Sequence, residues 1–289
     1  MKKNADTFET VEIVAKGKMA LRFLYRTPPG RVLLKLLVVK PVSRCAGRIL
    51  NSRPTRVFIR GFVKRNKINM AEYPRVKYRS FNDFFTREVN MDYRPFPEND
   101  CDVAAPCDGK LTAYPITASG VFNIKNSVYT ISDLLEDKEL ASDFIDGVCM
   151  IFRLTPDDYH RYYYIDDGEI LAQKRIKGKL HAVRPIAQRR YNVFSRNARE
   201  YTVMQTRNFG KVVQMEVGAL FVGRISNNDS VQSFKRGDEK GMFQFGGSTV
   251  IMLFQKGAIT PDNKIFENTL NDKETIVRMG YIVGEKAKG

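Results

Sequence analysis

From about residue 101 onward, the chain is divided into many short apolar runs separated by glycine and Asn/Asp turn signals. The runs cover residues 103–105, 111–114, 148–154, 169–176, 179–184, 200–206, 211–217, 219–225, 249–255 and 281–283. Runs of this length and spacing are typical of antiparallel strands and not of βαβ units. In this region only residues 132–143 have a clear helical pattern. The sequence therefore predicts an α+β fold with a mainly antiparallel β core.

Positive charge is concentrated in the N-terminal part of the chain. The formal net charge is +16, with 48 Lys and Arg against 32 Asp and Glu. Residues 13–71 contain no acidic residue and fifteen of those 48 basic ones, which leaves 33 basic residues to face 32 acidic residues elsewhere. We therefore predict two parts: a basic helical arm over residues 1–75 and a core over residues 76–289.

The arm has the pattern of short amphipathic helices. Arg56, Arg60 and Lys64 are four residues apart, so a helix places them on one face, with hydrophobic side chains between them. Such a helix can lie in an anionic lipid headgroup layer. The apolar block at 32–39 is too short to span a bilayer. A helical hairpin packed on the core and a phosphate-binding surface for nucleic acid are the alternatives. Bulky aliphatic residues among the charges favour a membrane surface over nucleic acid.

The cysteines and the N-terminus indicate the compartment. Cys45, Cys101, Cys107 and Cys149 show no paired metal-ligand spacing, and the chain has two histidines, so no metal site is predicted. Scattered cysteines suit a reducing compartment. The polar N-terminus, which includes acidic residues, lacks a secretory signal pattern. We expect a peripheral membrane protein on the cytoplasmic face of the cell membrane, with no nucleic-acid partner.

One stretch, residues 245–254, combines flexibility with a hydroxyl nucleophile. Gly246 and Gly247 precede Ser248, and a continuous apolar run follows. Glycine lets a hydroxyl approach the preceding carbonyl and tolerates strained backbone angles. Taken alone, the stretch is more often a glycine bulge that leads into a core strand.

Two further residues are candidates for chemistry with Ser248. Asp108 lies at the tip of an Asp-Gly turn, and His160 follows an apolar strand beside two carboxylates, where its pKa could be tuned toward neutrality. The trio would fit a charge relay, although geometry decides such cases, and the serine lacks a G-x-S-x-G elbow. The other histidine, His181, lies in an alternating segment and is interpreted as structural.

Seven segments in order resemble the pyruvoyl-dependent phosphatidylserine decarboxylase proenzymes. They are Ser80–Arg94 with Pro95, Ala105–Lys110, Leu154–Arg161, Val183–Pro185, Asn192–Glu200, Val217–Ile225 and Phe234–Leu253. The resemblance covers about residues 75–285. Each segment alone is a weak signal, but seven in family order are specific.

The resemblance implies both an activity and a self-processing step. Ser248 would attack the Gly247 carbonyl and cleave the chain into a β chain, 1–247, and an α chain, 248–289. Ser248 would become a pyruvoyl group, with no metal, that forms a Schiff base with the amine of phosphatidylserine in an anionic membrane. Loss of CO₂ would give phosphatidylethanolamine, a step of phospholipid biosynthesis. Asp108 would orient a histidine.

The sequence departs from the family pattern at two positions. Where the family usually has a second histidine, this chain has Tyr163, a poor base at neutral pH that can still donate a proton. His160 is then the remaining candidate base. Arg224 stands where a serine is common. Two alternatives stay open: a processing-deficient lipid-binding relative on the same fold, and a family member that decarboxylates a soluble amino acid. The sequence is also compatible with a homodimer.

Overall fold

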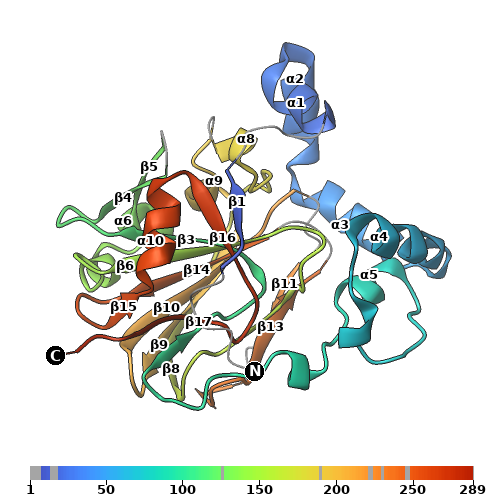
Figure 1. Cartoon of the computed structure of the whole chain (residues 1–289). Helices are drawn as coiled ribbons and strands as arrows, with labels where there is room; N and C mark the ends of the chain where they lie inside the picture. The colour runs from blue at the N-terminus through green and yellow to red at the C-terminus, as the bar shows by residue number, and fades with distance from the viewer. Residues whose placement is uncertain are drawn as a thin grey trace.

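The computed structural model describes residues 8–13, 19–124, 127–188, 191–220, 224–228, 231–244 and 248–288. Within these ranges the protein consists of an antiparallel sheet core and a set of helices from the N-terminal part of the chain, which lie along one side of it (Figure 1). The expected α+β class with a mainly antiparallel core is confirmed. The division near residue 75 stays a prediction.

The core is a nine-stranded sheet in which every neighbouring pair is antiparallel. In spatial order its strands are β1 (Thr10–Glu12), β16 (Lys273–Val277), β3 (Gly109–Pro115), β6 (Val148–Leu154), β14 (Ser248–Phe254), β10 (Gly210–Val217), β9 (Arg199–Thr206), β8 (Gly168–Ile176) and β12 (Ser233–Phe234). The N-terminal strand β1 thus pairs at one edge with β16, which is the last strand of this sheet along the chain. At the centre, β14 has all seven residues buried, as the continuous apolar run predicts.

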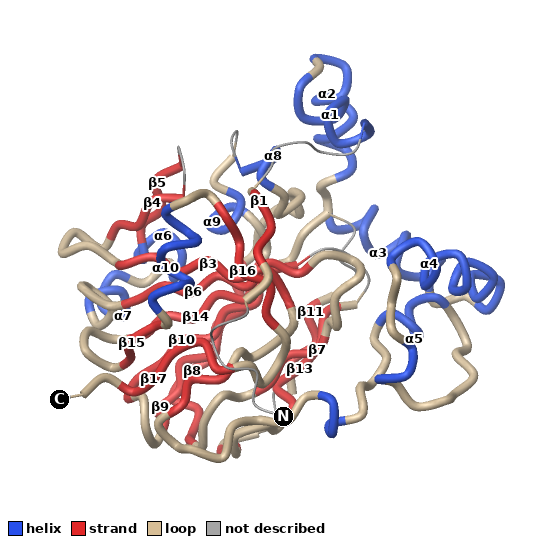
Figure 2. Tube along the Cα trace, in the orientation of Figure 1, coloured by secondary structure: helices blue, strands red, loops and turns tan. Residues whose placement is uncertain are grey.

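Three smaller sheets complete the β structure, as the red segments of Figure 2 show. They contain β11 (Ile225–Asn227), β13 (Glu239–Phe243) and β7 (Arg161–Tyr163); β15 (Ile259–Pro261), β17 (Ile282–Lys286) and β2 (Asp102–Ala104); and β4 (Val121–Ile124) with β5 (Ser127–Thr130). Most expected strands are confirmed within a residue or two. Residues 179–184 are wrong as a strand, because they make only an isolated bridge from Lys179 to Asn197. In the run 219–225, only Ile225 belongs to a described strand.

The helices of the arm are short, as its sequence pattern predicts. They are α1 (Met19–Arg26), α2 (Pro28–Leu37), α3 (Lys40–Leu50), the 3₁₀ helix η2 (Arg53–Val57), α4 (Phe58–Asn66) and η3 (Met70–Glu72). Proline begins α2, where its missing N–H costs nothing, and the Thr27 side chain caps it by accepting from the Gly30 N–H. No helix in the described part of the chain is long and apolar enough to cross a bilayer.

A capped helix connects the arm to the core. In α5 (Phe81–Phe85) the Ser80 hydroxyl accepts from the Asp83 N–H at 3.1 Å, and the Asp83 carboxylate accepts from the Arg79 N–H at 2.7 Å. In the sequence, Ser80 followed three residues later by Asp83 predicts this cap and a helix over residues 80–88; the helix ends earlier, at Phe85. The 3₁₀ helix η4 (Met91–Tyr93) follows.

The single helix expected over residues 132–143 is wrong, because the structure has two. They are α6 (Ile131–Leu135) and α7 (Lys138–Ser142), separated by Glu136 in a left-handed conformation with φ 47°. Asp137 then caps α7 by accepting from the Leu140 N–H. Three further helices of the core were not expected: α8 (Pro185–Gln188), α9 (Val193–Arg196) and α10 (Asn263–Leu270).

Candidate active site

Ser248 is the first residue of the central strand β14. It pairs with Leu154 of β6, and its neighbour Thr249 pairs with Val217 of β10. The Ser248 side chain is 0% exposed, and its Oγ has no hydrogen-bond partner in the described structure. A buried hydroxyl without a partner costs about 1–3 kcal/mol, so the position is suited to chemistry more than to stability. Gly246 and Gly247 lie outside the described residues.

His160 and Ser248 lie at opposite ends of an interruption in the pairing between two antiparallel chain segments, which we call the ladder break. The chain segments β6–β7 and β13–β14 run antiparallel to each other, since β6 pairs with β14 and β7 pairs with β13. The last partners on one side of the break are Leu154 and Ser248. On the other side, the His160 carbonyl accepts from the Phe243 N–H at 2.9 Å. Residues 155–159 on one segment and 244–247 on the other therefore separate the two side chains.

His160 is a neutral, oriented imidazole. Its side chain is 0% exposed and packs on the Phe85 ring of α5, with ring centroids 4.1 Å apart. Nδ1 lies 2.8 Å from the Asp158 carbonyl, which can only accept, so Nδ1 carries the proton and Nε2 presents a lone pair. Nε2 has no partner in the described structure. Burial lowers the His160 pKa to about 3, which keeps the ring uncharged at neutral pH.

A lysine that was not predicted to take part in the site holds the loop before His160. Lys110 Nζ lies 2.7 Å from both carboxylate oxygens of Asp158 and 2.7 Å from Thr155 Oγ1. The Thr155 N–H also donates to Asp158 Oδ2 at 2.6 Å. Burial raises the Asp158 pKa, and Lys110 acts in the opposite direction. These contacts fix Asp158, whose carbonyl orients His160.

Asp108 is held by the buried arginine Arg94. Arg94 donates from Nε to Oδ1 and from Nη2 to Oδ2, both at 3.1 Å, and the Met279 N–H donates to Oδ1 at 2.8 Å. Arg94 Nη2 also lies 2.8 Å from Glu72 Oε2, so one buried guanidinium serves two carboxylates. Burial alone would lower the Arg94 pKa, but Asp108 and Glu72 raise it. Asp108 makes no hydrogen bond to His160 in the described residues, and its role stays a prediction.

Tyr163 lies next to the Asp108 turn. Its N–H donates to the Pro106 carbonyl at 2.9 Å, and its ring belongs to a buried cluster that includes Met279, the residue whose N–H binds Asp108. The Tyr163 hydroxyl lies 2.9 Å from that of Tyr159. Burial raises the Tyr163 pKa to about 12, so the phenol stays protonated at neutral pH. It is available as a proton donor and not as a base.

A buried ion pair lies beside the start of β14. Glu216 of β10 is opposite Val250, which puts it on the same sheet face as Ser248. Both Glu216 oxygens lie 2.9 Å from Lys240 Nζ of β13, and Asn227 Nδ2 donates to Glu216 at 3.2 Å. Sequence reasoning missed this pair, although an acid in the middle of an apolar run is a signal, because a charge so placed needs a partner.

The remaining sequence candidates lie apart from these contacts. His181 is buried and stacked on Tyr191 with centroids 4.4 Å apart, consistent with a structural residue, but it lies outside any strand. Arg224 is exposed, and its carbonyl accepts from the Gln244 N–H at 2.9 Å. The arm residues Arg56, Arg60 and Lys64 are all exposed. No group of three or more His, Cys, Asp or Glu in the described ranges could hold a metal ion.

Comparisons with known proteins identify relatives along nearly the whole chain. The phosphatidylserine decarboxylase family model matches residues 81–285. Phosphatidylserine decarboxylase proenzyme 2 of Clostridium acetobutylicum is 47% identical over 266 residues, which cover 92% of this chain and 91% of that protein. The phosphatidylserine decarboxylase proenzymes of Fusobacterium nucleatum and Clostridium novyi are 38% and 37% identical, over 93% and 96% of this chain and 92% and 95% of theirs.

Proposed function

The chain belongs to the phosphatidylserine decarboxylase family, and we propose that it is a proenzyme whose Ser248 is both the cleavage residue and the source of the catalytic group. The activity of the family is that of a carboxy-lyase, which converts phosphatidylserine to phosphatidylethanolamine and CO₂. The assignment of Ser248 rests on one observation. Its hydroxyl is fully buried and has no hydrogen-bond partner in the described structure, and the residue is the first of the central strand β14.

Self-cleavage at Gly247–Ser248 needs no outside reagent except water. Ser248 Oγ attacks the Gly247 carbonyl carbon, the peptide C–N bond breaks, and an ester replaces the amide. A base then removes the Ser248 Cα proton, the Cβ–Oγ bond breaks, and Gly247 leaves as a carboxylate. Residue 248 is now dehydroalanine, which takes up water and loses ammonia to become a pyruvoyl group. We assign proton acceptance to His160 Nε2, the buried lone pair at the other end of the ladder break.

The residues around Ser248 suit a pyruvoyl group there. When present, this group supplies an electrophilic carbonyl for the substrate amine and an electron sink for loss of CO₂. The chain excludes water by complete burial of β14. It holds the severed α chain by pairing β14 to β6 and β10, and β16 to β1 and β3. The Tyr163 phenol, close to the Asp108 turn, is the proposed proton donor.

The arm is proposed to dock the enzyme on an anionic membrane surface, at the cytoplasmic face. Arg56, Arg60 and Lys64 are exposed, and so are large apolar side chains between them, with Val57 74% and Phe58 63% exposed. Cations beside exposed apolar groups are suited to a headgroup layer, where each basic residue contributes about 1 kcal/mol. This docking would bring the site to a substrate that resides in the membrane.

A second candidate is a processing-deficient lipid-binding relative, and one observation favours it: Tyr163 stands where the family usually has a histidine. A denaturing gel separates the two. The proposal expects a β chain of residues 1–247 and a small α chain of residues 248–289. A single uncut band after prolonged incubation would support the alternative.

The matched variants for this test are Ser248→Ala and Thr249→Val. Both remove one buried hydroxyl without a partner in the described structure, from adjacent residues of the same strand. Ser248→Ala should abolish both cleavage and decarboxylation of phosphatidylserine vesicles, whereas Thr249→Val should still be cut. Decarboxylation retained by Ser248→Ala would refute the pyruvoyl assignment. Activity on free serine but not on vesicles would instead indicate a soluble substrate.

A further inference from the structure

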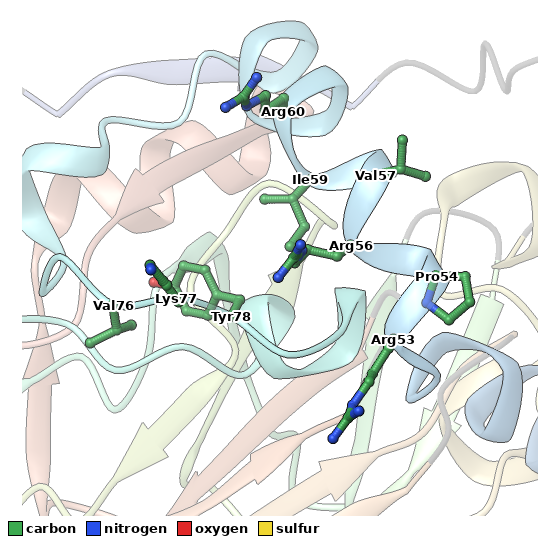
Figure 3. A pocket seen from close by; sticks show the side chains of 9 residues that line it. All are labelled: Arg53, Pro54, Arg56, Val57, Ile59, Arg60, Val76, Lys77 and Tyr78. Carbon is green, nitrogen blue, oxygen red and sulfur yellow. The ribbon is translucent and has the colours of Figure 1, made fainter.

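An open groove lies between the η2–α4 segment of the arm and residues 76–78, which follow the arm. Its volume is about 810 Å³. Figure 3 shows the side chains that line it, which come from both segments. Arg53, Arg56 and Arg60 belong to the η2–α4 side, and Lys77 belongs to the facing segment. Four cations therefore surround one space.

These four cations have no acid to neutralise them. None of the four side chains makes an ion pair or hydrogen bond in the described part of the chain, and residues 13–71 contain no Asp or Glu. Tyr78 also lines the groove. Like charges held close together without a counterion repel each other, so the groove favours an anion. Guanidinium and ammonium groups are suited to binding phosphate oxygens.

The rim of the groove is apolar and exposed, which bears on the source of the anion. Val57 is 74% exposed and Val76 58%, and they line the groove from opposite sides. A free phosphate or a nucleic acid would leave these aliphatic side chains in water. A phospholipid headgroup layer would bury them while its phosphates meet the cations.

Contacts between the η2–α4 side of the groove and α5, the helix that follows residues 76–78, hold the two walls in place. The Phe81 N–H donates to the buried Thr55 hydroxyl at 3.0 Å, and Asn82 Nδ2 donates to Asn51 Oδ1 at 2.9 Å. The Phe62 ring of α4 packs edge-on against Phe81 of α5, with centroids 5.1 Å apart. The groove thus exists before a ligand arrives, which lowers the entropy cost of binding.

Helix α5 contacts both helix α4 of the groove and the candidate active site. On one side of α5, Phe81 and Phe84 pack on Phe62 of the groove helix. Phe85 of the same helix packs on the His160 ring. A five-residue helix therefore separates the arm groove from the proposed base.

We propose that this groove binds the phosphate of an anionic phospholipid headgroup, as a lipid site separate from the site at Ser248. The proposal rests on membrane docking by the arm, as proposed above. It goes further, because it assigns a preformed site to particular residues. Diffuse attraction to a charged surface depends on the number of cations, whereas a site depends on which cations are removed.

Two double variants with the same charge distinguish a site from diffuse attraction. Arg56→Gln/Lys77→Gln removes one cation from each wall of the groove. Lys64→Gln/Arg65→Gln removes two exposed cations of α4 that do not line it. The probes are vesicles of phosphatidylcholine with and without phosphatidylglycerol, and the readout is the partition constant from co-sedimentation. Self-cleavage of each variant on a denaturing gel reports that its core has folded.

The groove variant should lose about tenfold more affinity for the phosphatidylglycerol vesicles than the α4 variant. Equal losses would overturn the groove site while leaving membrane docking intact. No loss in either variant would overturn docking itself. Inorganic phosphate and glycerophosphate, added in millimolar amounts, should compete poorly. If either displaced the protein from vesicles and bound equally well without them, the groove would be a site for free phosphate and not for lipid.

Discussion

Because His160 is buried, the folding stability of the protein should decrease as the pH falls below 6.5. The folded protein holds this ring neutral with a pKa of about 3, whereas the ordinary value is 6.5. Above pH 6.5 the ring is neutral in both the folded and unfolded states, so its full contribution to stability is present. As the pH falls from 6.5 toward 3, the unfolded state gains a proton that the folded state does not, and folding stability is lost.

At pH 4.5 the free energy of unfolding is lower by about 2.7 kcal/mol because of His160. This pH lies two units below the unfolded-state pKa of 6.5, and each unit corresponds to about 1.36 kcal/mol. The perturbation is His160→Gln in a Ser248→Ala background, which keeps the chain uncut and unfolding unimolecular. The assay is urea unfolding at pH 7 and at pH 4.5. Between pH 7 and pH 4.5, the free energy of unfolding should fall by about 2.7 kcal/mol less in the His160→Gln variant than in its parent. The carboxylates that also titrate in this range are common to both proteins, so their effect cancels in the comparison.

His181 provides the comparison within the same chain. Burial lowers its pKa to about 4, so His181→Gln should also reduce the acid loss, and the double variant should combine both reductions. Identical losses between pH 7 and 4.5 in the parent and in His160→Gln would refute the neutral, buried ring, and with it the orientation proposed for Nε2.

Three further experiments test other parts of the site. Arg94→Met leaves two buried carboxylates without their shared cation and should lower the free energy of unfolding by about 3–5 kcal/mol; a loss under about 1 kcal/mol would contradict that pairing. Lys240→Met should cost a similar ~3–5 kcal/mol, and adding Glu216→Leu should recover most of it; no recovery in urea unfolding would mean that the ion pair is not the cause. Tyr163→His restores the usual family residue and should speed self-cleavage on a timed gel; an unchanged or slower rate would show that the phenol does not limit processing.

The strands of the core could be predicted because burial on both faces makes them continuous apolar runs. The runs 148–154, 211–217 and 249–255 correspond to β6, β10 and β14, which lie side by side at the centre of the sheet. Short or half-exposed strands such as β7 and β13 carry no such run and were missed. Their pairing depends on residues far away in the chain, which a local pattern does not report.

The helix expected over 132–143 shows where a local signal was overlooked. Asp137 is a good capping residue, and it begins a second helix directly after a residue in the left-handed conformation. A single apolar periodicity across both helices hid this boundary. The cap at Ser80 was predicted because nothing before it competes for the same pattern.

Single site residues could be proposed from the sequence, but not the contacts between them. Ser248 was chosen as a hydroxyl directly before an apolar strand and His160 as an imidazole after one, and the structure places them at the two ends of one ladder break. Asp108 was expected to orient a histidine, which stays a prediction, and its hydrogen bonds in the described structure come from Arg94 and the Met279 N–H. An arginine that two carboxylates share is a property of three-dimensional packing, which residue order alone does not reveal.

The intact mass of the purified protein tests the claim that the chain cuts itself at Gly247–Ser248 and converts Ser248 to a pyruvoyl group. The claim predicts two chains, of residues 1–247 and 248–289, with the α chain lighter by one ammonia than a fragment that begins with serine. A single chain of 33.1 kDa after prolonged incubation, or an α chain that retains an N-terminal serine, would contradict it.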